Sequence, residues 1–416
     1  MKVFTKPELL APAGDFERLV TAVEYGADAV YLGSDCFGMR TAAASFGGDE
    51  LKKACDYAKS KGVKVYLTCN TVPRCNELSA LPSFLEYAQE SGVDALIITD
   101  IGVLELAKKY APNVEIHIST QAGITNYASA CAFYNLGAKR IVTARELSLS
   151  EIAEIRAKTP KDLEIECFVH GAMCVSFSGR CLLSNYMTGR DSNRGDCAQP
   201  CRWKYSLVEE KRPGEYFPIE QDESGTYIMN SRDMCLIEHI SELSEAGINS
   251  FKIEGRAKSA YYTAVSVNAY RCALDGYEAS GFASDYKPEQ WIIDEIGKVS
   301  NRKYCTGFYF SSPMDDAQIF ENGGYVREWD VAAIAEKWEN GILYASQRNR
   351  FFEGDELEIM IKSRKPVKVT VKTLKNGDGE IIENAPHPMM KLSFECPVEV
   401  PCGAYLRMER KGGAIL

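Results

Sequence analysis

Six of the chain's fifteen cysteines lie between Cys167 and Cys235, a high concentration of one reactive side chain. Thiolates bind soft metals and iron–sulfur clusters, and four converging thiolates are what such a cluster requires. From Cys174 to Cys235 the spacing is C-x6-C-x15-C-x3-C-x33-C, without the C-x2-C of zinc ribbons or bacterial ferredoxins. Glycines and polar residues around the thiols indicate a loop-like segment. We favour a metal or cluster site, with zinc as the alternative metal and buried structural thiols as the simpler alternative.

A peptidase site is a competing interpretation of the same segment. Neither His-Glu-x-x-His nor Gly-x-Ser-x-Gly occurs, and the chain has four histidines. A dyad of His170 with Cys174 or Cys181 is conceivable. Cysteines that hold a cluster cannot serve as nucleophiles, however. We therefore expect His170 to orient a ligand or to contact a substrate.

Further polar residues stand at the ends of predicted strands. They are Glu8, Asn70, Asp100, His117, Gln121, Arg145, Glu146, Lys252, Glu254 and Arg256. In a barrel enzyme the carboxyl ends of the strands face the active site, so we expect several of these side chains to converge there. Arg145, Lys252 and Arg256 suit carboxylate or phosphate recognition. Any one of them alone is more simply explained as part of a surface ion pair.

The elements that would position these residues form a regular series. The first 275 residues alternate short β-rich runs with amphipathic helical patterns. The predicted strands are Leu9–Ala11, Ala29–Leu32, Val65–Cys69, Ala95–Thr99, Ile116–Ser119, Arg140–Thr143, Glu164–Phe168 and Ser250–Ile253. Eight such units predict an α/β fold with a closed (β/α)8 TIM-like barrel, and a doubly wound open sheet is the competing topology.

The cysteines lie where this series is interrupted. About 80 residues separate the seventh and eighth strands, and the Cys-rich insertion over 172–230 begins where barrel enzymes keep their active sites. We expect a barrel domain over 1–275 and a connecting region over 276–325. Residues 326–416 contain successive strand patterns, which predict a small C-terminal all-β, barrel-like domain.

The charge balance limits the classes of partner. A net charge of −10 argues against a protein that coats nucleic acid non-specifically. Residues 171–205 are nevertheless locally basic, and residues 362–375 hold six cations and no acid. A solvated strand face is the simpler interpretation of the second segment, and an RNA backbone contact is the functional one.

The compartment follows from targeting signals and cysteine usage. The N-terminus has no signal-peptide pattern, and the most apolar stretch, over 95–107, is too short to span a bilayer. We therefore expect a cytoplasmic protein without membrane contact, in which the cysteines do not form a disulfide framework.

Several motifs, taken together, resemble one known family. They are Leu9-Leu-Ala-Pro-Ala-Gly-Asp15, Gly26-Ala-Asp-Ala-Val-Tyr-Leu-Gly33, His117-Ile-Ser-Thr-Gln121, Arg145-Glu-Leu-Ser-Leu, Phe168-Val-His-Gly-Ala-Met-Cys174, Ser178-Gly-Arg-Cys181, Asn193-Arg-Gly-Asp-Cys-Ala-Gln-Pro-Cys201 and Phe251-Lys-Ile-Glu-Gly-Arg256. Over essentially its whole length the chain resembles the collagenase-like peptidase family of unknown catalytic type. Its length and C-terminal part resemble the branch of prephenate-dependent tRNA uridine hydroxylases, which form 5-hydroxyuridine at the wobble position.

The resemblance implies a cofactor, a co-substrate and a partner. It implies a 4Fe-4S cluster held by Cys174, Cys181, Cys197 and Cys235, with Cys201 as an alternate fourth ligand. It also implies prephenate as the oxygen source. The target uridine would be splayed out of the anticodon arm of a tRNA, because base-modifying enzymes need an unstacked base.

We predict the following roles at the site. The expected catalytic groups are His170, Glu146 and Glu254. The expected substrate contacts are Asn70, His117, Gln121, Arg145, Lys252 and Arg256, of which the last three would bind carboxylates.

Two departures from the family pattern affect the substrate contacts. The family often has Asn where this chain has Ser45, and often Ser-His-Arg where this chain has Ser300-Asn-Arg302. Neither departure involves the cysteines. A collagenase-like peptidase remains the alternative function, and a scaffold that delivers iron–sulfur clusters or assists another hydroxylase is a third.

Overall fold

The computed structural model describes residues 5–34, 37–38, 46–174, 176–203, 207–208, 216–217, 232–310 and 326–415. The chain forms two compact units. The first contains residues 1–288 and 302–324, and the second contains residues 289–301 and 325–416. Within the described ranges, no helix is long and apolar enough to cross a membrane.

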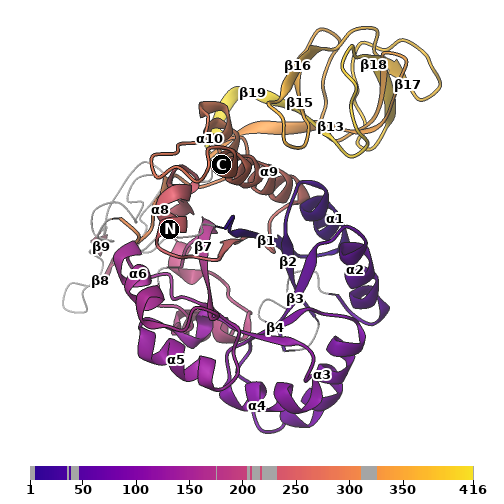
Figure 1. The fold of residues 1–416 in the computed structure, drawn as a ribbon. Helices are drawn as coiled ribbons and strands as arrows, with labels where there is room; N and C mark the ends of the chain where they lie inside the picture. Colours follow the sequence, from indigo (N-terminus) through magenta and orange to yellow (C-terminus); the bar gives the residue numbers. More distant parts are fainter. Residues whose placement is uncertain are drawn as a thin grey trace. The chain divides into compact units, whose positions relative to one another are not determined.

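Eight parallel strands of the first unit close into a barrel (Figure 1). In chain order they are β1 (Glu8–Ala13), β2 (Ala29–Gly33), β3 (Lys64–Cys69), β4 (Ala95–Ile98), β5 (Glu115–Ile118), β6 (Arg140–Val142), β7 (Glu164–Ala172) and β11 (Ser250–Ile253). Each pairs with the next, and β11 pairs with both β1 and β7, which closes the ring. The predicted TIM-like barrel is confirmed, and the open sheet is excluded.

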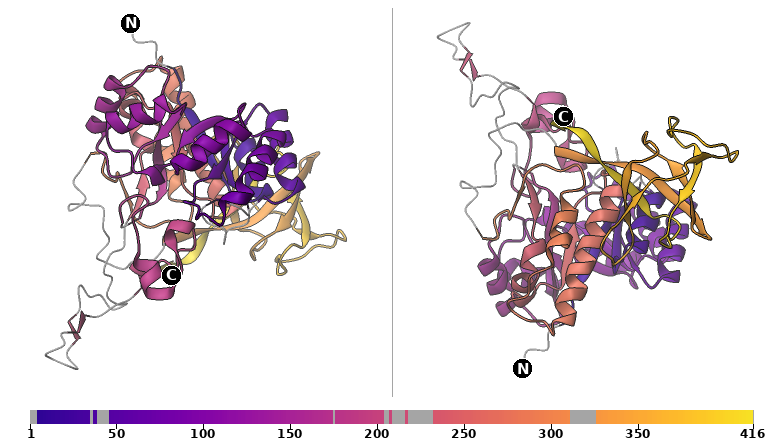
Figure 2. Two further views of the ribbon diagram at one scale, coloured as in Figure 1. Left: turned by 90° about the horizontal axis from the view of Figure 1, so that it is seen from below. Right: turned by 90° about the horizontal axis from the view of Figure 1, so that it is seen from above.

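Helices cover the outside of this barrel (Figure 1, Figure 2). They are α1 (Phe16–Glu24), α2 (Asp49–Ser60), α3 (Leu81–Glu90), α4 (Ile101–Tyr110), α5 (Tyr127–Asn135), α6 (Leu149–Lys158), α8 (Ile240–Glu245) and α9 (Ala260–Ala279), with η1 (Leu78–Ala80) before α3 and η5 (Ile237–His239) before α8. Polar caps set where several helices begin, because their oxygens accept backbone N–H groups that lack a helical partner. Asp15 caps α1, Asp100 caps α4, and Ser148 forms a capping box with Glu151 at α6.

The end of β7 carries an extension that the sequence patterns do not predict. β10 (Asp233–Cys235) pairs antiparallel with the last residues of β7, and β12 (Tyr304–Cys305) pairs parallel with β10. The buried pair of Asp233 and Arg302, 2.7 Å apart, joins the segments that carry these two short strands. Further short elements are η2 (Thr120–Ala122), α7 (Leu183–Thr188), η3 (Ser192–Arg194), η4 (Pro200–Arg202), β8 (Leu207–Val208) and β9 (Tyr216–Phe217).

The second unit is an antiparallel seven-stranded sheet that confirms the predicted all-β fold. Its elements are α10 (Gln290–Ile296), β13 (Val326–Glu339), β14 (Ile342–Gln347), β15 (Glu356–Met360), β16 (Val367–Thr370), β17 (Lys375–Asn376), β18 (Lys391–Glu395) and β19 (Tyr405–Ile415). Phe351, Phe394 and Leu406 pack in its core. Beside this core, the buried Arg407 guanidinium pairs with Glu295 and Glu358.

Candidate active site at the barrel mouth

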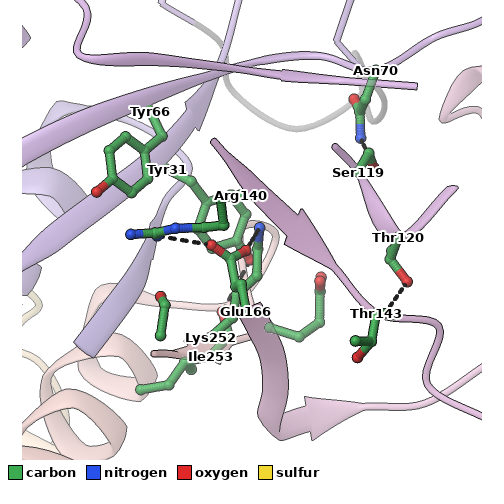
Figure 3. A network of polar contacts seen from close by, with 12 residues as sticks. Tyr31, Tyr66, Asn70, Ser119, Thr120, Arg140, Thr143, Glu166, Lys252 and Ile253 are labelled. Carbon is green, nitrogen blue, oxygen red and sulfur yellow. Dashed lines mark hydrogen bonds and ion pairs between the residues drawn. The ribbon is translucent and has the colours of Figure 1, made fainter. Parts of the chain in front are cut away.

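A group of paired charges from β1, β6, β7 and β11 lies inside the barrel (Figure 3). Glu166 on β7 accepts from Lys252 Nζ on β11 at 2.7 Å and from Arg140 on β6 at 3.1 Å. Arg140 also donates to Glu8 on β1 at 2.6 Å. Burial alone would raise the pKa of Glu166, but Lys252 and Arg140 hold it below its usual value. The positive and negative charges of these side chains therefore compensate one another inside the barrel.

Two of the predicted substrate contacts belong to this interior. Lys252 pairs with Glu166 and lies 4.4 Å from the ring centre of Tyr31. His117 lies within β5, fully buried against the edge of Tyr66. Its Nε2 is 3.6 Å from the Glu115 carboxylate, and burial lowers its pKa. Both side chains lie below the ends of the strands.

Two arginines that follow strands lie at the carboxyl ends, where a barrel site is expected. Arg145 follows β6, donates to the Ala172 carbonyl at 2.9 Å, and lies 3.3 Å from the Glu254 carboxylate. Its guanidinium is 3.8 Å from the ring centre of Phe168. Arg256 follows β11 and donates to Thr68 Oγ1 at 3.1 Å. Fixed guanidinium groups of this kind suit carboxylate or phosphate recognition.

Gly33 at the end of β2 has no side chain, and the Arg256 guanidinium occupies the space that a side chain would fill. A Cβ atom at this glycine would lie 2.3 Å from a guanidinium nitrogen of Arg256. A larger residue would therefore displace the arginine from the mouth.

The remaining predicted polar groups position loops at the same end. Glu146 accepts from the Ser178 backbone N–H at 2.8 Å and from its hydroxyl, which ties the Cys-rich segment to the loop after β6. Gly179 in that segment lies so close to the Gln121 backbone that a Cβ atom there would be 2.5 Å from its carbonyl oxygen. Asn70 donates to Ser119 Oγ at 3.3 Å (Figure 3).

His170 near the end of β7 lies in a cage of tyrosines. Its side chain is 1% exposed, and the rings of Tyr262, Tyr270 and Tyr304 lie between 5.4 and 5.9 Å from it. Neither ring nitrogen has a hydrogen-bond partner in the part of the chain that the structure describes. Burial lowers the pKa of His170 to about 4, so the ring is neutral at neutral pH. The tyrosines come from distant segments, and no sequence motif marked them.

The predicted metal ligands differ in their exposure to solvent. Cys174 and Cys197 are exposed, and Cys181, Cys201 and Cys235 are partly buried. Across the described ranges, no three His, Cys, Asp or Glu side chains are placed to hold a metal ion. Ser45 lies outside the described residues.

The surroundings of these thiols nevertheless have the chemistry of ligands. Partial burial opposes ionisation of Cys181, but hydrogen bonds from Ser176, Ser192 and the α7 backbone lower its pKa. Cys197 Sγ accepts the Gln199 backbone N–H at 3.3 Å. Burial instead raises the pKa of Cys235 to about 11. The hydrogen bonds to Cys181 and Cys197 are of the type that a thiolate ligand accepts.

Comparisons with known proteins cover almost the entire chain. Residues 14–319 match peptidase family U32, and residues 327–407 match the peptidase family U32 C-terminal domain. The chain is 37% identical to tRNA hydroxylation protein P1 of Bacillus subtilis, over 94% of this chain and 92% of that protein. It is 35% identical to tRNA hydroxylation protein P of Escherichia coli, over 98% of each chain. A collagenase of Porphyromonas gingivalis is 34% identical, over 74% of this chain and 75% of that protein.

Proposed function

The chain belongs to peptidase family U32, and from its similarity to tRNA hydroxylation proteins we propose that it is a tRNA-modifying hydroxylase. Its product would be 5-hydroxyuridine at the anticodon wobble position, and prephenate would be the co-substrate. The observation that carries the proposal is 37% identity, over 94% of this chain, to a protein named for tRNA hydroxylation.

The arginines at the barrel mouth supply the recognition that this reaction needs. Prephenate carries two carboxylates, and Arg145 and Arg256 would bind them through charge-assisted hydrogen bonds. Arg145 is already oriented by the Ala172 carbonyl and by the Phe168 ring. Lys252 stays with Glu166 in the barrel interior and would stabilise the fold.

Glu254 and His170 would handle protons beside the bound co-substrate. The Glu254 carboxylate lies next to Arg145, and its backbone N–H donates to the His170 carbonyl at 2.8 Å. His170 is neutral at neutral pH, so its ring can donate or accept a hydrogen bond without adding charge. Glu146 would act by holding Ser178, and with it the Cys-rich segment, at the mouth.

We further propose that Cys174, Cys181, Cys197 and Cys235 hold a 4Fe-4S cluster, with Cys201 as the alternate fourth ligand and zinc as the alternative metal. The hydrogen bonds to Cys181 and Cys197 support this assignment, because such bonds orient and tune metal ligands. A bound cluster would supply electron-transfer chemistry.

Iron content tests the cluster separately from the reaction. Protein purified without oxygen should contain about four irons per chain. Cys181→Ala should lose most of this iron, and Cys55→Ala, which alters a buried cysteine of α2, should retain it. An iron-free wild-type protein with full hydroxylase activity would remove the cluster from the account.

Nucleoside analysis tests the function itself. Deleting the gene should abolish wobble 5-hydroxyuridine in a strain that has no second copy of the activity, and the intact gene should restore it. A strain with unchanged 5-hydroxyuridine would overturn the proposal. No contact in the described structure favours the peptidase, because His170 has no hydrogen-bonded nucleophile there.

A further inference from the structure

The short helix α7 in the Cys-rich segment presents its apolar side outward. Tyr186 is 82% exposed, and Leu182, Leu183 and Met187 are also exposed. At 100° per residue these four positions span an arc of about 140°. Ser184, on the other side of the helix, is fully buried. An ordinary surface helix has the opposite arrangement, with its apolar stripe facing the core.

Exposed aromatic residues extend this surface on both sides. Trp203 follows η4, which packs against α7. Phe177 precedes the helix, and a Cβ atom at Gly123, after β5, would lie 3.5 Å from its ring. We call the exposed side chains of Phe177, Leu182, Leu183, Tyr186, Met187 and Trp203 the α7 face.

Polar contacts outside the α7 face hold the Cys-rich segment in place. Ser184 accepts the Ala198 backbone N–H at 3.0 Å on the buried side of α7. Asn193 donates to the Cys181 carbonyl at 2.7 Å, and Ser178 is tied to Glu146. Because polar contacts anchor the helix, the outward apolar side chains are available to a partner.

We propose that the α7 face binds unstacked bases of a single-stranded RNA loop, an inference that rests on the proposed function. Aromatic side chains stack on any base, and nearby cations attract the RNA backbone. Between residues 174 and 203 the chain has four arginines and two aspartates, although its net charge is −10. The exposed Arg180 lies in this range, and the exposed Arg190 is paired with Asp196 at 2.7 Å. An apolar protein partner would not require this local excess of positive charge.

The position of the face fits such a role. Ser178 and Gly179 fasten the start of the segment to the loops after β6 and β5, at the carboxyl ends of the strands. Bases that flank the target uridine would rest on the α7 face while the target nucleotide enters the barrel mouth. The face would therefore favour an open loop over a paired stem.

Binding of two RNAs tests the inference. The probes are an anticodon stem-loop and a fully paired duplex of the same length, each followed by fluorescence anisotropy with the full chain. Tyr186→Ala and Trp203→Ala should each weaken stem-loop binding about tenfold and leave duplex binding nearly unchanged. Tyr186→Phe should bind like the wild type, because its ring still stacks. Tyr344→Ala, which removes an exposed tyrosine from the second unit, is the matched control.

Three outcomes separate the possibilities. Unchanged stem-loop affinity in both alanine variants would overturn the inference. A wild-type dimer that Tyr186→Ala dissociates would also overturn it and would make the face an interface between copies of this chain. If the face binds the loop as expected but the wild type forms no 5-hydroxyuridine, the proposed function fails while the RNA-binding surface stands.

Discussion

Buried charged groups are paired differently inside the barrel and at its mouth. Inside the barrel, Glu166 accepts hydrogen bonds from both Lys252 and Arg140 within 3.1 Å. At the mouth, Arg145 donates to the Ala172 carbonyl at 2.9 Å and has a longer contact of 3.3 Å to Glu254. The ring nitrogens of His170 at the mouth, like those of His117 in the interior, have no hydrogen-bond partner in the described residues. A closed network stabilises one fold, whereas incompletely satisfied polar groups can bind a ligand. We therefore propose that the ion pairs inside the barrel stabilise the fold and that the groups at the mouth bind the substrate.

Removing the central charge of the interior should have the largest effect. Glu166→Gln leaves Lys252 and Arg140 buried without their shared partner, and we expect a loss of about 3–5 kcal/mol in the free energy of unfolding. Denaturant unfolding measures it. The control is Glu164→Gln, which alters a half-exposed partner of Arg140 and should cost no more than about 1 kcal/mol. Equal effects of the two variants would show that the interior is not a coupled network.

At the mouth, Arg145→Ala should affect activity more than stability. Loss of a charge-assisted hydrogen bond costs about 1.5–3 kcal/mol, which corresponds to about 10–100-fold less 5-hydroxyuridine at limiting prephenate. Product is measured by mass spectrometry and stability by thermal unfolding. Arg145→Lys should fall between the alanine variant and the wild type. Full activity of Arg145→Ala would remove this residue from the site.

The pH dependence of the free energy of unfolding tests whether His117 is buried in the barrel interior. Burial lowers its pKa in the folded protein below the ordinary value of about 6.5. The unfolded chain then binds the proton more readily, so this contribution is complete above about pH 6.5 and declines as the pH falls below it. His117→Phe should show a shallower loss of stability between pH 7.5 and 5 than the wild type. His387→Asn, which alters an exposed histidine, should keep the wild-type slope.

Thr68→Val should produce the smallest effect. It removes the 3.1 Å hydrogen bond that orients Arg256 and preserves the shape of the side chain. A loss of about 1 kcal/mol predicts about fivefold lower product formation at limiting prephenate, with a decrease in melting temperature smaller than that of Glu166→Gln. If the variant retains wild-type kinetics, Arg256 does not depend on Thr68 for its position.

Strand periodicity was sufficient to predict the barrel but not every strand. The prediction for Ser250–Ile253 matches β11, because the apolar Phe251 and Ile253 alternate with the polar Ser250 and Lys252. The sequence patterns do not mark the residues that form β13 and β19 as strands. The register of β13 shifts near Arg327 and Val331, and its Ala332, Ala333 and Ala335 lack the β-branched character of a strand.

The positions of site residues could be predicted where they follow the end of a strand. They could not be predicted where the side chain's contacts come from distant parts of the chain. Arg145 and Arg256 follow their strands by three residues, close to where the expected boundaries placed them, at two and three residues. Lys252 and His117 point into the interior, where their partners come from other strands, and no local pattern marks such pairs. The cysteine spacing likewise does not determine how close the sulfur atoms lie, because the length of a long loop does not fix its path in space.

Purified protein, prephenate and tRNA that lacks the modification provide the most direct test of the central claim. We predict that the wild type forms wobble 5-hydroxyuridine, that Arg145→Ala forms far less, and that Tyr344→Ala matches the wild type. Absence of 5-hydroxyuridine with iron-loaded, folded wild-type protein would contradict the account.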